Sequence, residues 1–165
     1  MKRMLVIDPY RCTGCRLCEL ICSATKQGEF KPSASRIRIV SNSRIGLSIP
    51  TVCLQCRKPW CQSVCAAEAI ERDPISGIVT VNEEKCHGCR QCISACPYGN
   101  MGFDIDRGIA TKCDLCKGTP RCVEVCYPNA IESKDLHKSL TMKSRILFGK
   151  TVQQSFASQK GTDER

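Results

Sequence analysis

Apolar residues in this chain occur mainly in short runs, and such runs predict short strands. The first run, residues 4–7, should form a strand that leads into a loop. Residues 36–40 and 45–49 flank a polar turn, which predicts a hairpin with a basic face. We also expect a short strand directly after a turn at residues 69–71 and at residues 130–132.

The last part of the chain, residues 133–165, follows a different pattern. Apolar side chains lie there at helical spacing on two stripes: Phe148, Val152 and Phe156 on one, and Leu136, Leu140 and Leu147 on the other. We therefore predict a C-terminal helical arm. Such an arm either folds back on its own chain or docks another subunit or a second copy. Docking is the sharper hypothesis, because the body offers little apolar core for the arm to join.

The composition explains why little core is expected. Of 165 residues, 16 are cysteine, whereas the chain has only one Trp, three Tyr and four Phe. Large aromatic side chains usually supply much of the apolar area in a core of this size. A group bound to the thiols must therefore provide part of the cohesion.

The compartment determines what so many thiols can do, because disulfides persist in oxidising compartments and are rare in reducing ones. The N-terminal apolar run is too short for a signal peptide, and there is no twin-arginine pair. No apolar run approaches the roughly 20 residues that span a bilayer. We expect a cytoplasmic protein without a transmembrane segment, and export on a signal-bearing partner is the alternative.

The cysteines form four groups of four. Two groups have the spacing C-x2-C-x2-C-x3-C: Cys12, Cys15, Cys18 and Cys22, and Cys86, Cys89, Cys92 and Cys96 with Pro97 behind. The other two have a longer central spacing: Cys53, Cys56, Cys61 and Cys65, and Cys113, Cys116, Cys122 and Cys126. The run that ends in Cys-Pro is that of bacterial ferredoxins, so the sequence predicts four 4Fe-4S clusters. There are two alternatives. Zinc sites use separated C-x2-C pairs and fit these spacings less well. A disulfide framework fits a reducing compartment less well.

The spacing has a mechanical reason. Two residues between ligands let one tight loop wrap a cluster with three thiolates, and Gly14 and Gly88 ease that turn. We expect the fourth cysteine of each group to begin a helix and face away from the loop. It then ligates the neighbouring cluster, as in two-cluster ferredoxins.

An internal repeat indicates which groups share clusters. Residues 7–16 align with residues 81–90, and residues 65–71 align with residues 126–132. The segment between the second and third groups contains a hairpin turn at residues 73–77, in the order that a two-cluster ferredoxin has. The remaining two groups occur in the reverse order, which indicates a permuted second module.

We therefore predict an α+β fold of tandem bacterial-ferredoxin-like modules, with small hairpins and short helices around the clusters. An inner two-cluster module, residues 53–100, is inserted in a permuted outer module, residues 1–29 plus 101–132. Residues 30–52 are a hairpin insertion, and residues 133–165 are the C-terminal arm.

This order assigns crossed ligand sets, each with three cysteines of one group and the last cysteine of another. The predicted sets are Cys12, Cys15 and Cys18 with Cys126; Cys113, Cys116 and Cys122 with Cys22; Cys53, Cys56 and Cys61 with Cys96; and Cys86, Cys89 and Cys92 with Cys65.

On these motifs the chain resembles the four-cluster ferredoxin-like electron-transfer subunits of molybdenum and tungsten oxidoreductases, hydrogenases and carbon monoxide dehydrogenases. The resemblance covers about residues 3–132 and includes the segments 34–38, 96–100 and 112–116. It implies four 4Fe-4S clusters and a non-catalytic role. The compact group at residues 113–126 looks most like the small iron-sulfur subunits of tungsten-dependent aldehyde oxidoreductases and benzoyl-CoA reductases.

No phosphate-binding loop, Ser-His-Asp set or acid-base carboxylate pair stands out, so we expect no catalytic residue. We predict a subunit that relays single electrons between a large catalytic tungsten or molybdenum subunit and a second redox partner, a flavoprotein or a ferredoxin. The alternative is a diffusing polyferredoxin, or an assembly factor for a hydrogenase, a formate dehydrogenase or a carbon monoxide dehydrogenase.

The formal charge of +9 suggests a nucleic-acid partner at first sight. An oxidised 4Fe-4S core adds about +2 and its thiolates about −4, so four clusters bring the charge to about +1 and full reduction to about −3. Aromatic residues for base stacking are also scarce, so we exclude nucleic acid.

Several side chains beside the cysteines are candidates for tuning or shielding a cluster. A positive charge next to a ligand either favours the reduced cluster or only adds solubility, and six residues fit this description: Arg11, Arg16, Lys85, Arg90, Lys112 and Lys117. Trp60, the only Trp, either shields a cluster or contacts a subunit.

Overall fold

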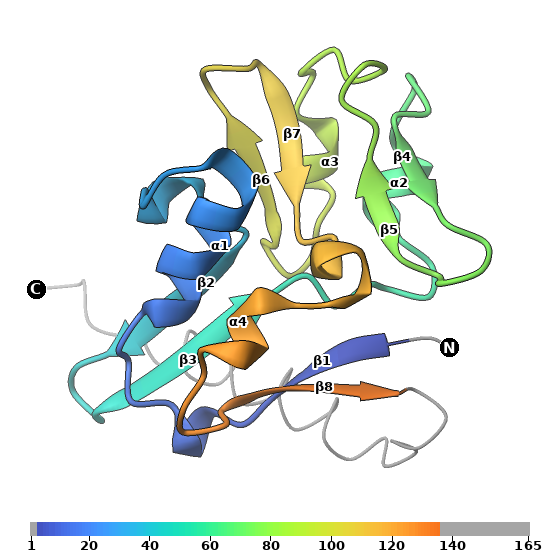
Figure 1. The fold of residues 1–165 in the computed structure, drawn as a ribbon. Helices are drawn as coiled ribbons and strands as arrows, with labels where there is room; N and C mark the ends of the chain where they lie inside the picture. Colours follow the sequence, from blue (N-terminus) through green and yellow to red (C-terminus); the bar gives the residue numbers. More distant parts are fainter. Residues whose placement is uncertain (1–2, 136–165) are drawn as a thin grey trace, which may run out of the picture.

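The computed structural model describes residues 3–135, which form short helices and two-stranded antiparallel sheets (Figure 1). The helices are η1 (Pro9–Arg11), α1 (Leu17–Gln27), η2 (Pro32–Ala34), α2 (Trp60–Ser63), α3 (Gln91–Ser94), η3 (Leu115–Gly118) and α4 (Arg121–Glu124). The strands are β1 (Arg3–Ile7), β2 (Ile37–Asn42), β3 (Leu47–Val52), β4 (Ile70–Arg72), β5 (Val79–Val81), β6 (Met101–Asp104), β7 (Ile109–Lys112) and β8 (Ile131–Asp135). The predicted α+β character with small hairpins is confirmed. The helical stripes of the predicted arm lie outside the described residues.

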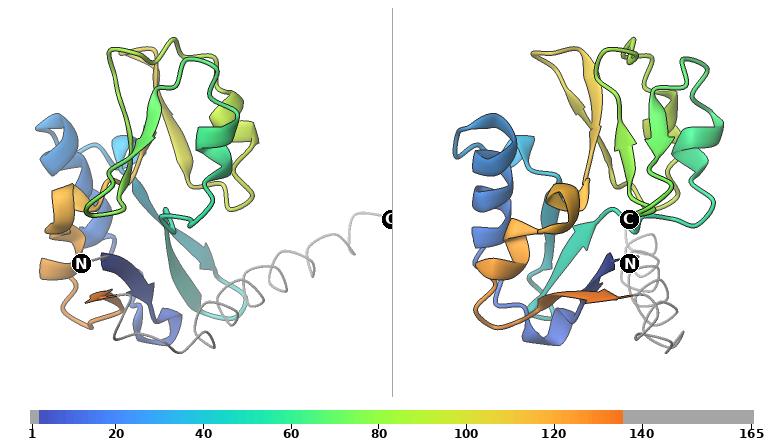
Figure 2. Two further views of the ribbon diagram at one scale, coloured as in Figure 1. Left: turned by 90° about the vertical axis from the view of Figure 1, so that its right-hand side faces the viewer. Right: turned by 45° about the vertical axis from the view of Figure 1, so that its right-hand side comes forward.

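The elements gather in two groups in space (Figure 2). One group holds the hairpins β4–β5 and β6–β7 with the helices α2 and α3. The other holds the pairs β1–β8 and β2–β3 with α1 and α4. The two groups are connected by the chain between β3 and α2 and by the chain that leaves β7.

The first and last strands of the described chain pair with each other. Ile7 lies opposite Ile131, and the antiparallel register continues to Arg3 and Asp135. The predicted strands at residues 4–7 and 130–132 are thus confirmed, and β8 continues beyond the second segment. Pairing of the two ends brings the first cysteine group close to the last one.

The hairpin predicted at residues 36–49 is confirmed, but its strands lie further along the chain. β2 and β3 flank a turn at residues 43–46, where Asn42 Oδ1 accepts a hydrogen bond from the Arg44 N–H and Gly46 has a φ of 63°. Gly46 supplies the left-handed residue that this turn requires. The register is therefore set by the Asn and Gly positions rather than by the apolar run.

The predicted turn at residues 73–77 is confirmed between β4 and β5. The Asp73 carboxylate accepts hydrogen bonds from the Ile75 N–H at 3.1 Å and from the Ser76 hydroxyl at 2.7 Å. The third hairpin, β6–β7, has no counterpart in the sequence prediction. Its turn is closed by Asp104 Oδ1, which accepts from the Arg107 N–H at 3.0 Å.

The helices begin earlier than predicted. We expected a helix to start at the fourth cysteine of each group, but α1 starts at Leu17 and α3 at Gln91, before the third cysteine. Arg16 and Arg90 precede these helices in the left-handed conformation, with φ near 60°, and turn the chain out of the cysteine loop. The fourth cysteine of the first group, Cys22, therefore lies inside α1.

The internal repeat is also present in the backbone. Positive φ values recur at equivalent positions: at Gly14 and Gly88, at Arg16 and Arg90, at Gln55 and Leu115, and at Glu68 and Asn129. Non-glycine residues seldom adopt this conformation. Its recurrence at aligned positions indicates that the two halves of the repeat fold in the same way.

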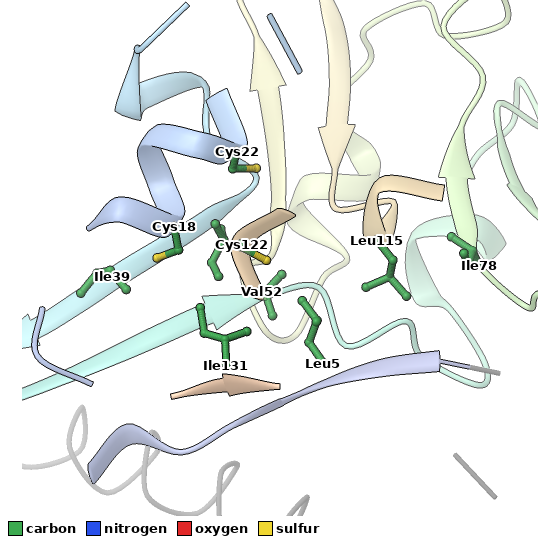
Figure 3. Close-up of a cluster of buried hydrophobic side chains, with 10 residues drawn as sticks. Leu5, Cys18, Cys22, Ile39, Val52, Ile78, Leu115, Cys122 and Ile131 are labelled. Carbon is green, nitrogen blue, oxygen red and sulfur yellow. The ribbon is translucent and has the colours of Figure 1, made fainter. Parts of the chain in front are cut away.

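Two buried clusters hold the molecule together, and cysteines belong to both. In the larger cluster, Cys18, Cys22 and Cys122 lie among apolar side chains such as Val52 and Ile131 (Figure 3). The smaller cluster is formed by Ile70, Val79, Cys92, Met101 and Ala110. As the composition suggested, the cores contain thiols in place of aromatic rings.

Candidate iron-sulfur sites

All sixteen cysteines are free thiols, and most of them lie in or beside the two buried clusters. Three surface cavities are each lined by four of them. We name these cavities 1, 2 and 3. Cavity 1 is lined by Cys53, Cys56, Cys61 and Cys96; cavity 2 by Cys22, Cys113, Cys116 and Cys122; and cavity 3 by Cys12, Cys15, Cys18 and Cys126.

Every cavity combines three cysteines of one group with the last cysteine of another. In cavity 3 the fourth cysteine is Cys126, which follows α4 and reaches the first loop because β8 pairs with β1. In cavity 2 the fourth is Cys22, which projects from α1 next to α4. Helix and strand pairing between distant segments thus brings the four thiols of each cavity together.

The remaining four cysteines are Cys65, Cys86, Cys89 and Cys92. Burial and, to a smaller extent, the charges of Cys86, Cys61, Cys89 and Cys65 together raise the pKa of Cys92 to about 11. Cys65 and Cys86 also pack against the same buried cluster as Cys92. Cys65 therefore lies close to the loop of the Cys86 group.

Backbone amides point at several of the sulfur atoms. Four N–H groups donate to thiols: Arg36 to Cys22 at 3.3 Å, Asn100 to Cys96 at 3.4 Å, Ala110 to Cys86 at 3.4 Å and Leu115 to Cys113 at 3.4 Å. Such donors stabilise thiolate charge. In iron-sulfur proteins they are one of the means by which the protein sets the reduction potential.

Burial makes these thiols hard to ionise alone. It raises the pKa of Cys18 and of Cys113 to about 12, and it raises the pKa of Cys122 as well. Neighbouring cysteines add to each of these shifts. A positively charged group among them is needed to hold four thiolates together, and an iron-sulfur core supplies that charge.

The donor set and its surroundings fit a 4Fe-4S core. Soft thiolates are the ligands that iron-sulfur clusters take. Apolar side chains line part of each cavity: Val79 and Met101 in cavity 1, Ile37 and Val52 in cavity 2, and Ile39 and Ile131 in cavity 3. Within residues 3–135, no three Cys, His, Asp or Glu side chains lie close enough to share a single metal ion, which a zinc site requires.

The basic residues beside the ligands divide into two kinds. Five are exposed, some with a partner of their own: Arg11 lies 3.7 Å from Glu132, Lys85 lies 2.6 Å from Glu71, and Arg90 stacks over the Phe103 ring. Lys112, the sixth, is only 3% exposed, and its side chain lines cavity 1. Sequence alone did not separate Lys112 from the others.

Two aromatic rings lie at the rim of cavity 1. Trp60 is 63% exposed and Tyr98 is 53% exposed, and both line the cavity. The predicted shielding role of Trp60 is thus consistent with its position beside Cys61, while its outer face is open to a partner. His87 is exposed.

No helix within residues 3–135 is long and apolar enough to cross a bilayer.

Comparison with protein families gives two matches. The 4Fe-4S dicluster domain matches residues 46–136, and a 4Fe-4S binding domain matches residues 9–25.

The chain is also similar to proteins with assigned roles. It is 42% identical over 123 residues to the polyferredoxin-like subunit of aliphatic sulfonate oxidoreductase of Pyrococcus furiosus, a match that covers 74% of this chain and 70% of the relative. It is 34% identical over 161 residues to the electron transport protein HydN of Escherichia coli, covering 84% of this chain and 91% of the relative. Among solved structures, it aligns with the active site complex BamBC of benzoyl coenzyme A reductase with benzoyl-CoA at 25% identity and a TM-score of 0.48, covering 92% of this chain and 96% of that chain.

Proposed function

We propose, from the premise that this chain belongs to the 4Fe-4S dicluster-domain family of ferredoxin-like electron-transfer proteins, that it relays single electrons through four clusters inside a larger oxidoreductase complex. The observation that carries the proposal is the presence of cavities lined by four cysteines each. Relatives that cover most of this chain are named as electron-transport proteins or oxidoreductase subunits, which supports a carrier rather than a catalyst.

Each cluster takes three ligands from one loop and the fourth from a distant segment. Cavity 3 supports the set Cys12, Cys15, Cys18 and Cys126; cavity 2 supports Cys113, Cys116, Cys122 and Cys22; and cavity 1 supports Cys53, Cys56, Cys61 and Cys96. Cavity 1 accounts for Cys61, so the packing of Cys65 and Cys86 against the buried cluster that contains Cys92 supports Cys86, Cys89, Cys92 and Cys65 as the fourth set.

The crossed sets correspond to two ferredoxin-like modules, one inserted in the other. The inner module is residues 53–100, and the outer one is residues 1–29 plus 101–132. Pairing of β1 with β8 supports this arrangement, because it joins the two parts of the outer module. The matching positive φ values at Glu68 and Asn129, each near the end of its module's cysteine group, support it as well.

The cavities provide what single-electron relay requires. A cluster accepts and passes one electron with little movement of its ligands, so the protein must fix the thiolates and limit the access of water. Apolar side chains line the cavities, and N–H groups of the flanking segments donate to sulfur, for example from Asn100 to Cys96. Both features adjust the potential without a catalytic residue.

A large catalytic tungsten or molybdenum subunit is the partner that we propose, with a flavoprotein or a ferredoxin as the second redox partner. The Pyrococcus furiosus relative supports a complex of this kind, since its name makes it a subunit of an oxidoreductase. The Escherichia coli relative, named an electron transport protein, supports the alternative of a separate carrier. Affinity purification of the full chain, with mass spectrometry and tungsten and molybdenum analysis of what accompanies it, distinguishes the two.

A pair of double variants tests the crossed sets. In the crossed arrangement Cys53 and Cys96 share a cluster, so the double variant Cys53→Ser/Cys96→Ser should lose one cluster and retain about twelve of about sixteen iron atoms. Cys92 and Cys96 lie in different sets, so Cys92→Ser/Cys96→Ser should lose two clusters and retain about eight. Iron analysis of anaerobically purified protein gives the counts. The reverse pattern would show that each group binds its own cluster.

A further inference from the structure

The residue that precedes a cysteine loop differs between the two halves of the repeat. β3 ends in Thr51-Val52 before Cys53, and β7 ends in Thr111-Lys112 before Cys113. Both final side chains are buried, Val52 at 2% exposure and Lys112 at 3%. A valine in one half therefore corresponds to a buried lysine in the other.

Each of these side chains crosses to the cavity of the other loop. Val52 precedes Cys53 in the chain but lines cavity 2, whose thiols come from the Cys113 loop. Lys112 precedes Cys113 but lines cavity 1, whose thiols come from the Cys53 loop. The lysine thus connects the Cys113 loop, which it precedes in the chain, with cavity 1, which it lines.

The Lys112 ammonium has polar partners but no carboxylate. Its Nζ donates to the Val79 carbonyl and, at 3.5 Å, to the Cys113 carbonyl. None of the ion pairs formed by residues 3–135 includes Lys112. No carboxylate in the described part of the chain therefore neutralises its positive charge.

Gln55 forms hydrogen bonds with the same two residues, Val79 and Cys113. Its Nε2 donates to the Cys113 carbonyl at 2.6 Å, and its Oε1 accepts from the Val79 N–H at 2.8 Å. The equivalent residue in the other half is Leu115, which is apolar and buried. Gln55 and Lys112 together form a polar bridge between cavity 1 and the Cys113 loop, and the repeat has no second copy of it.

The ammonium lies close enough to act on the thiols of cavity 1. Burial raises the pKa of Cys61, and the charge of Lys112 opposes this increase. Burial also raises the pKa of Cys56, and the charge of Lys112 again opposes the increase. At cavity 2, by contrast, the nearby cations Lys26 and Arg36 share a carboxylate, Asp114, at 2.7 and 3.8 Å.

We infer that Lys112 is a charge-compensating residue that raises the reduction potential of the cluster at cavity 1. Reduction adds one negative charge to a cluster, and a buried, unneutralised ammonium beside it favours the reduced form because the surrounding dielectric is low. Gln55 acts as a positioning residue, since it also donates to the Cys113 carbonyl, one of the two carbonyls to which the ammonium donates. The inference rests on the proposed function, because it needs a redox-active cluster at cavity 1.

Potentiometric titration of the full cluster-loaded chain, followed by electron paramagnetic resonance, tests the inference. Lys112→Met keeps the aliphatic stem and removes the charge. At a fixed solution potential it should lower the ratio of reduced to oxidised cluster about tenfold at one site, which for one electron equals about 59 mV. The affected signal should be the one that is missing in Cys53→Ser/Cys96→Ser.

Two matched variants separate charge from structure. Lys112→Arg keeps the positive charge and should keep the potential. Gln55→Leu takes the residue of the equivalent position, keeps the charge of Lys112 and should shift the potential much less than Lys112→Met does.

The inference is overturned by either of two results. One is a Lys112→Met protein with full iron content and four unchanged midpoints. The other is a Lys112→Arg protein that keeps its iron but shifts the midpoint as far as Lys112→Met does, which would show that the charge does not set the potential. A wild-type chain without reducible clusters would instead contradict the proposed function itself.

Discussion

Three glycines with the same backbone conformation have different surroundings, and this difference leads to a graded prediction. Gly14, Gly88 and Gly99 have φ between 62° and 71°. A Cβ at Gly88 would collide with the backbone carbonyl of Gly108, one at Gly14 would lie 2.8 Å from the Ser48 hydroxyl, and one at Gly99 would have no atom within 4 Å.

Gly99→Ala should therefore cost only the left-handed conformation, about 1 kcal/mol. Gly14→Ala should cost slightly more, because the Ser48 side chain can rotate away. Gly88→Ala should cost about 3 kcal/mol or more, because a backbone oxygen has to move. Anaerobic thermal unfolding and iron content give the order, and equal losses in Gly88→Ala and Gly99→Ala would show that the loop yields easily.

At the residue scale, the candidate ligands were predictable and the residues that tune them were not. The cysteine spacing is a local property, because a tight loop can present thiols only at certain intervals. Lys112 resembles Lys117 and Lys85 in the sequence, since each lies near a ligand. The burial of Lys112 is a property of the tertiary structure, because the end of β7 lies at the cavity of the Cys53 loop.

At the element scale, one side chain connects the long helix α1 to the open edge of a hairpin. β2 pairs with β3 on one side only, and the Ile39 N–H on its other side donates to Glu19 Oε1 at 2.6 Å. Glu19 is 4% exposed and also lies 3.5 Å from Arg16. This carboxylate thus fixes the helix that carries Cys18 and Cys22.

Glu19→Ala should destabilise the protein by about 2 kcal/mol, since it leaves the Ile39 N–H buried without an acceptor. Glu19→Gln keeps an oxygen at the same place and should lose less. Denaturant unfolding under anaerobic conditions compares the two variants. If they are equally stable, the hydrogen bond to β2 is not what Glu19 contributes.

Strands were easier to predict than helix starts and the β6–β7 hairpin. Apolar runs next to the cysteine groups were enough to predict β1 and β8, because the apolar residues of these strands are consecutive in the sequence. β6–β7 has short strands, and its buried Asp104 accepts from the distant Gln27 at 2.7 Å. The starts of α1 and α3 depend on a left-handed arginine, a conformation that the residue type does not reveal.

At the scale of the whole molecule, the order of the cysteine groups was informative because the chain is internally repeated. Pairing of β1 with β8 brings the first and last groups to one cavity, although more than a hundred residues separate Cys18 from Cys126. The sequence contained the repeat but not the cavities. These depend on packing between α1 and α4 and on crossing side chains such as Val52.

The charge of the whole molecule should depend on its clusters, and this can be measured directly. The formal charge of the chain is +9, whereas four oxidised clusters with their thiolates should leave about +1 and full reduction about −3. In anaerobic isoelectric focusing, the reduced protein should therefore focus at the lowest pH, the oxidised protein higher, and the cluster-free chain highest.

The double variant Cys53→Ser/Cys96→Ser provides the matched control for this charge series. It should focus above the oxidised wild type, because loss of one cluster removes about two net negative charges. If the cluster-free chain focuses at the same pH as the cluster-loaded chain, the clusters do not carry the thiolate charge. The basic surplus would then be free to serve an anionic partner. If the series is found as expected, most of the surplus balances the bound thiolates, and the chain presents a nearly neutral body to the subunits with which it exchanges electrons.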